Sequence, residues 1–123
     1  MDLNNLRKLS QKWHDDTVKL ILQKCAPQEI AQELVSKLQA KATTEAEKGE
    51  YEAMACFVFW SAYEEDNSPL GHFNEDTAKK ASEILFKMIQ EQVKDKDIQL
   101  ELIVSECLRK NSYGIYIEAS VKW

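Results

Sequence analysis

The sequence predicts an α+β fold in which a three-stranded antiparallel sheet carries helices packed on one face. Three observations support this prediction. Apolar residues recur at helical spacing in three long segments, the aromatic run at 57–60 lacks that spacing, and apolar and polar residues alternate along the C-terminal segment from residue 98. The predicted order is helix, helix, strand, helix, strand, strand.

Length and composition indicate a single domain covering residues 1–123. The hydrophobic fraction of 44% and the charged fraction of 30% are typical of a globular chain with its own core. The net charge of −5 argues against binding to nucleic acid or to an anionic membrane surface. The three cysteines include no CxxC pair, so we expect reduced thiols in an intracellular compartment.

The N-terminus has no apolar signal segment, and no apolar run has the length of a membrane span. These features predict a cytoplasmic protein without a membrane partner.

Three segments have the periodicity of helices. Residues 2–25 start at a possible cap, Asp2, and form either one helix or two helices with a kink near residue 15. Their main apolar stripe consists of Leu6, Leu9, Trp13 and Leu20.

The second predicted helix covers residues 27–48, because Pro27 suits a first turn and Gly49 suits the residue after a helix end. A loop at 64–74 is followed by the third helix at 75–94, with Asn74 or Asp76 as its cap.

Residues 51–60 are predicted to form a strand. In a helix, Phe57, Val58, Phe59 and Trp60 would point in four directions, which requires burial on all sides. Aromatic and β-branched content also favours a strand. The sequence at 44–47 resembles a capping box, so a helix starting there is the alternative.

The C-terminal segment predicts a β-hairpin of residues 98–105 and 113–123 around a polar turn at 109–112. With residues 113–123 in the middle, the sheet is antiparallel throughout. We expect helices 27–48 and 75–94 to cover the face that carries Phe57, Phe59, Leu100, Leu102, Ile115 and Ile117.

The second face of this sheet is the predicted functional surface. It would carry Met54, Cys56, Val58, Trp60, Ile103, Cys107 and Tyr116, with Glu50, Glu52, Glu101, Glu118 and Lys122 around them. Exposed aromatic and Met side chains within a charged rim are typical of protein-binding surfaces. The predicted partner-binding residues are Met54, Val58, Trp60, Ile103 and Tyr116. Alternatively, the N-terminal helix covers this face with its apolar stripe and the chain is a compact monomer.

No catalytic residue, metal site or cofactor is predicted. His14, Asp15 and Asp16 are adjacent on a helix, so they point about 100° apart and do not converge on one ion. Cys56 and Cys107 are predicted to be inert thiols among apolar neighbours in strands.

The predicted function is that of a small cytoplasmic protein-interaction domain, an accessory, adaptor or inhibitor protein that is not an enzyme. It would bind another protein or itself, as a homodimer. One alternative is a small enzyme or ligand-binding domain with a site near the 66–76 loop, which contains His72 and Asp76. The other is a weak nucleic-acid binder that uses Arg7, Lys8, Lys12, Arg109 and Lys110 beside Trp13 and Tyr113.

Overall fold

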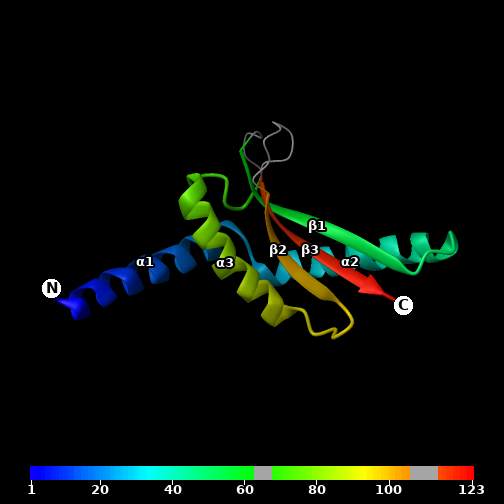
Figure 1. The fold of residues 1–123 in the computed structure, drawn as a ribbon, viewed down its shortest axis with the longest axis horizontal. Coiled ribbons are helices and arrows are strands. Elements are labelled where there is room, and N and C mark those ends of the chain that lie inside the picture. Colours follow the sequence, from blue (N-terminus) through cyan, green and yellow to red (C-terminus); the bar gives the residue numbers. More distant parts are fainter. Residues whose placement is uncertain (63–67, 106–113) are drawn as a thin grey trace.

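The computed structural model describes residues 1–62, 68–105 and 114–123. The predicted α+β class and the predicted element order are confirmed (Figure 1). The turn predicted at 109–112 and the first part of the loop predicted at 64–74 lie outside the described residues. The elements are α1 (Leu3–Lys24), α2 (Pro27–Glu47), β1 (Glu52–Ser61), α3 (Glu75–Gln92), β2 (Gln99–Ser105) and β3 (Gly114–Lys122).

The three strands form one antiparallel sheet in the order β1-β3-β2. As predicted, β3 lies in the middle, which makes β1 and β2 the edge strands. Helices α2 and α3 contact each other and pack on the same face of the sheet. The largest fully buried apolar side chains are Ile21, Leu34, Leu38, Phe59, Leu70, Leu85, Ile89, Ile115 and Ile117.

The helix starts agree with the sequence. The Asp2 carboxylate accepts a hydrogen bond from the Asn5 backbone N–H (3.2 Å), and the Asn74 side chain accepts one from the Thr77 N–H (2.9 Å). Helix α1 continues through residue 15 as one helix, so the alternative of two helices is wrong. None of the helices in the described ranges combines the length and apolar character needed to cross a membrane.

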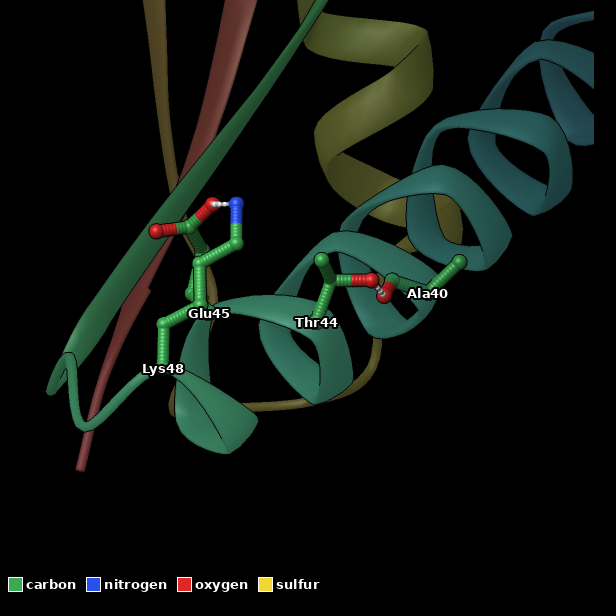
Figure 2. A network of polar contacts seen from close by, with 4 residues as sticks. All are labelled: Ala40, Thr44, Glu45 and Lys48. Carbon is green, nitrogen blue, oxygen red and sulfur yellow. Dashed lines mark hydrogen bonds and ion pairs between the residues drawn. The ribbon is translucent and has the colours of Figure 1, made fainter.

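The end of α2 explains why β1 can form. The Thr44 hydroxyl donates to the Ala40 carbonyl oxygen (3.1 Å), and Glu45 pairs with Lys48 (3.9 Å) on the same last turns (Figure 2). Gly49 has a φ of 85°, and its N–H donates to the Ala46 carbonyl oxygen (3.0 Å). Residues 44–47 therefore end one helix and do not start another. The strand predicted at 51–60 is confirmed, because the chain after Gly49 forms β1.

One irregularity in β1 changes the direction of its last aromatic side chains. Val58 lies opposite Tyr116 and Trp60 lies opposite Ile115, so Phe59 is an extra residue, as in a β-bulge. Phe59 and Trp60 are both buried in the core beneath the helices. The prediction that Trp60 lies on the second face is wrong, because it assumed strict alternation along the whole strand.

Two hydrogen bonds join the segment after β1 to this bulge. The Trp60 indole Nε1–H donates to the Phe73 carbonyl oxygen (3.0 Å), and the Leu70 N–H donates to the Phe59 carbonyl oxygen (3.0 Å). Leu70 is fully buried. The bulge thus directs the chain toward the start of α3.

Trp60→Phe is expected to lower the free energy of unfolding by about 1–3 kcal/mol, because the Phe73 carbonyl loses its indole donor and the core loses volume. Trp123→Phe is the matched control, because Trp123 is 48% exposed, and it should change stability by less than about 0.5 kcal/mol. Urea unfolding measures both values. Equal effects of the two substitutions would contradict the structural role of Trp60.

Ser82→Ala is expected to stabilise the protein by about 0.5–1 kcal/mol. The Ser82 side chain is fully buried on α3, and its hydroxyl has no hydrogen-bond partner within the described residues. Alanine removes this desolvated hydroxyl and has the higher helix propensity. Calorimetry should show a higher Tm, and an unchanged or lower Tm would indicate that the hydroxyl has a partner.

Candidate functional site

The face of the sheet opposite the helices is called the open face, because no helix of the described chain packs on it. Strand register arranges its side chains in three rows across β1, β3 and β2. The rows are Met54–Ser120–Gln99, Cys56–Glu118–Glu101 and Val58–Tyr116–Ile103.

Four of the five predicted partner-binding residues lie on this face. Val58, Tyr116 and Ile103 form one continuous row, and Met54 lies four residues before Val58 on β1. Met54 is 49% and Val58 45% exposed, whereas Ile103 and Tyr116 are half-buried. Trp60, the fifth predicted residue, is buried on the other side of the sheet.

Carboxylates lie in the middle of the open face. The sequence placed Glu101 and Glu118 around the apolar residues, but the register puts them directly opposite each other in the central row. Like charges in directly opposed positions of a sheet are destabilising. Glu52 lies opposite Lys122 at the end of the face, so the described part of this surface carries three acidic side chains and one basic one.

The carboxylates of the central row affect the pKa values of neighbouring side chains. Partial burial, followed by the charge of Glu118, raises the pKa of the Cys56 thiol, while Lys41 acts in the opposite direction. Burial, followed by Cys56, Glu118 and Glu101, raises the pKa of the Tyr116 hydroxyl. Cys56 is exposed but stays a neutral thiol near neutral pH, which does not suit a nucleophile.

Helix α1 does not cover the open face of its own chain. It packs on α3, and its buried residues are Thr17 and Ile21. Its predicted covering residues Leu6, Leu9 and Trp13 are exposed, so the alternative in which they seal the second face of the same chain is wrong.

The described residues on which the two alternative functions depend do not lie on the open face. His72 is exposed and its ring lies 4.3 Å from that of Phe73, whereas His14 is exposed on α1. Asp15 accepts a hydrogen bond from the Gln11 side chain (2.9 Å). In the described ranges, no three His, Cys, Asp or Glu side chains are gathered as metal ligands would be. Arg109, Lys110 and Tyr113 of the nucleic-acid alternative, and also Cys107, lie outside the described residues.

A shallow hollow between the start of α2 and the end of α3 is lined mainly by amide and aliphatic side chains. Its lining includes no His or Cys, and its charged residues are Lys94 and Asp95. This set contains no pair of groups placed as a nucleophile and its base.

Glu118→Gln is expected to lower the pKa of Cys56 toward the ordinary thiol value, because it removes the negative charge that opposes thiolate formation. At mildly alkaline pH, alkylation of Cys56 by iodoacetamide should become faster, as measured by peptide mass spectrometry. Glu75→Gln on α3 is a control that should leave the rate unchanged. An unchanged rate in Glu118→Gln would contradict the effect of the central row.

Comparisons of the chain with protein-family models, with curated proteins and with solved structures found no match. Its function is therefore inferred from the residues and geometry of the open face.

Proposed function

We propose that this chain is a small protein-interaction domain that binds another protein, or a second copy of itself, through the open face. The observation that carries the proposal is the partly exposed row Val58–Tyr116–Ile103, with Met54 on the same face, on a side of the sheet that no helix among the described residues covers. As an accessory, adaptor or inhibitor protein of the cytoplasm, it would act by binding and not by catalysis.

The chemistry of this face supports binding. Met and Tyr are enriched in protein interfaces, where Tyr supplies a rigid apolar ring with a polar tip. Covering Met54 and Val58 would remove apolar surface from water, which favours association by about 25 cal/mol per Å² before the costs of binding.

The carboxylates add selectivity for the partner. A surface placed over Glu101 and Glu118 must supply cations, because burying these two charges without partners is costly. The same carboxylates oppose association of the face with apolar or acidic surfaces. We therefore propose a partner surface that combines apolar side chains with Lys or Arg.

Val58→Asp is expected to weaken association roughly tenfold or more, about 1.4 kcal/mol, because it adds a fourth carboxylate to the face and removes the exposed apolar side chain at one end of the row. Val104→Asp is the matched control: Val104 is 41% exposed on β2 but lies opposite Ile115, on the other side of the sheet. Sedimentation velocity measures self-association, and quantitative affinity capture from the native cell measures other partners.

Circular dichroism melts must show that both variants are folded. The proposal is supported if Val58→Asp loses association that Val104→Asp retains. It is overturned if wild-type and both variants stay monomeric and capture the same proteins in equal amounts.

A further inference from the structure

The N-terminal half of α1 is a second apolar surface that is exposed among the described residues. Figure 1 shows this half extending past α3, away from the sheet. We call residues 3–13 the arm. Every residue of the arm is exposed. Its large apolar side chains are Leu3, Leu6, Leu9 and Trp13, which are 55%, 47%, 57% and 39% exposed.

These side chains continue the face of α1 that packs on α3. Trp13, Thr17 and Ile21 follow each other at intervals of four residues, which places them on one side of the helix. Thr17 and Ile21 are buried, and Trp13 lies at the margin, with the Lys80 ammonium 5.8 Å from its ring centroid. The arm therefore presents an exposed apolar stripe on the part of α1 that extends past α3.

The charges of the arm complement those of the open face. The arm contains Arg7, Lys8 and Lys12 and no acidic residue. At 100° per residue, Arg7 and Lys12 flank the stripe, whereas Lys8 lies on the opposite side of the helix. The open face offers the carboxylates of its central row.

The arm cannot reach the open face of its own chain, because Thr17 and Ile21 hold α1 on α3, at the other side of the sheet. A second copy has no such constraint. The arm, at 1.5 Å per residue, is about 16 Å long. Met54 and Val58 lie about 13 Å apart along β1, and the outer strands are separated by about 10 Å, so one arm matches this surface in size.

We propose that the arm of one copy packs across the open face of a second copy, with Leu6, Leu9 and Trp13 over the Val58–Tyr116–Ile103 row. Arg7 and Lys12 flank the stripe on opposite sides, and the central row lies on one side of the Val58–Tyr116–Ile103 row, so one of the two cations then lies near Glu101 and Glu118. Reciprocal exchange of the two arms closes a two-fold dimer, so both copies use the same surfaces. The inference rests on the proposed function, because it names the partner of the open face.

A disulfide bond tests the contact directly. Ser10 lies on the stripe side of the arm and Cys56 is exposed in the central row of the open face. In a Cys25→Ala, Cys107→Ala background, Ser10→Cys should form a covalent dimer under mild oxidation. Peptide mass spectrometry should identify a 10–56 linkage between chains, and Cys56→Ser should abolish it. Lys8→Cys, on the opposite side of the arm, is the matched control and should yield several-fold less dimer.

Charge exchange tests the same contact in solution. Arg7→Glu with Lys12→Glu should raise the dimer Kd tenfold or more in sedimentation velocity, and so should Glu101→Lys with Glu118→Lys. The four substitutions together should restore most of the lost affinity, because the charges are exchanged between the two surfaces. Lys8→Glu should have little effect. All arm residues are exposed, so the substitutions in the arm leave the core intact.

The outcomes separate this inference from the proposed function. A 10–10 linkage without charge rescue would indicate pairing of the two arms and would overturn the inference. If Val58→Asp abolishes binding while the arm variants behave like wild-type, the open face binds something other than the arm. If neither Val58→Asp nor the arm variants change association, both proposals are wrong.

Discussion

The bulge between Val58 and Trp60 determines which side chains each face of the sheet receives. One extra residue in β1 brings Phe59 and Trp60 to the same side, whereas strict alternation would separate them. The indole N–H then reaches the Phe73 carbonyl and fixes the path of the chain before α3. The core, the connection to α3 and the composition of the open face all depend on this local change in register.

The bulge also limits how apolar the open face can be. With Trp60 in the core, the face retains side chains of moderate size, and the central row Cys56–Glu118–Glu101 separates Met54 from the Val58 row. A larger continuous apolar surface would favour non-specific association. If the open face binds a partner as proposed, its carboxylates would disfavour surfaces that lack cations, so charge would contribute to selectivity alongside apolar contact.

The fold was largely predictable because its elements have clear boundaries in the sequence. Pro27 and Gly49 delimit α2, and the alternation in residues 98–123 indicates both the hairpin and its buried side. The bulge was missed because alternation within one strand contains no information on the register of its neighbour. Leu70 was missed for a related reason: it lies in a Pro- and Gly-containing segment of the type that usually lies on the surface, yet it is fully buried.

The candidate site was predictable only in part. Four of its apolar residues follow from alternation, but the opposition of Glu101 and Glu118 depends on cross-strand register. The position of α1 was also undetermined, because an amphipathic stripe shows that a helix can be covered without showing what covers it. Tertiary packing on α3 buries Thr17 and Ile21, which are not in the predicted stripe, and leaves Leu6, Leu9 and Trp13 exposed.

Under the proposed function, the opposed pair of Glu101 and Glu118 would link folding to occupancy of the open face. Their repulsion acts within the folded sheet, whereas an unfolded chain holds the two carboxylates at larger and variable distances. A cationic partner that binds only the folded sheet relieves this repulsion and stabilises the fold by mass action. Under the proposed function, the unfolding temperature would therefore rise with the concentration of the partner.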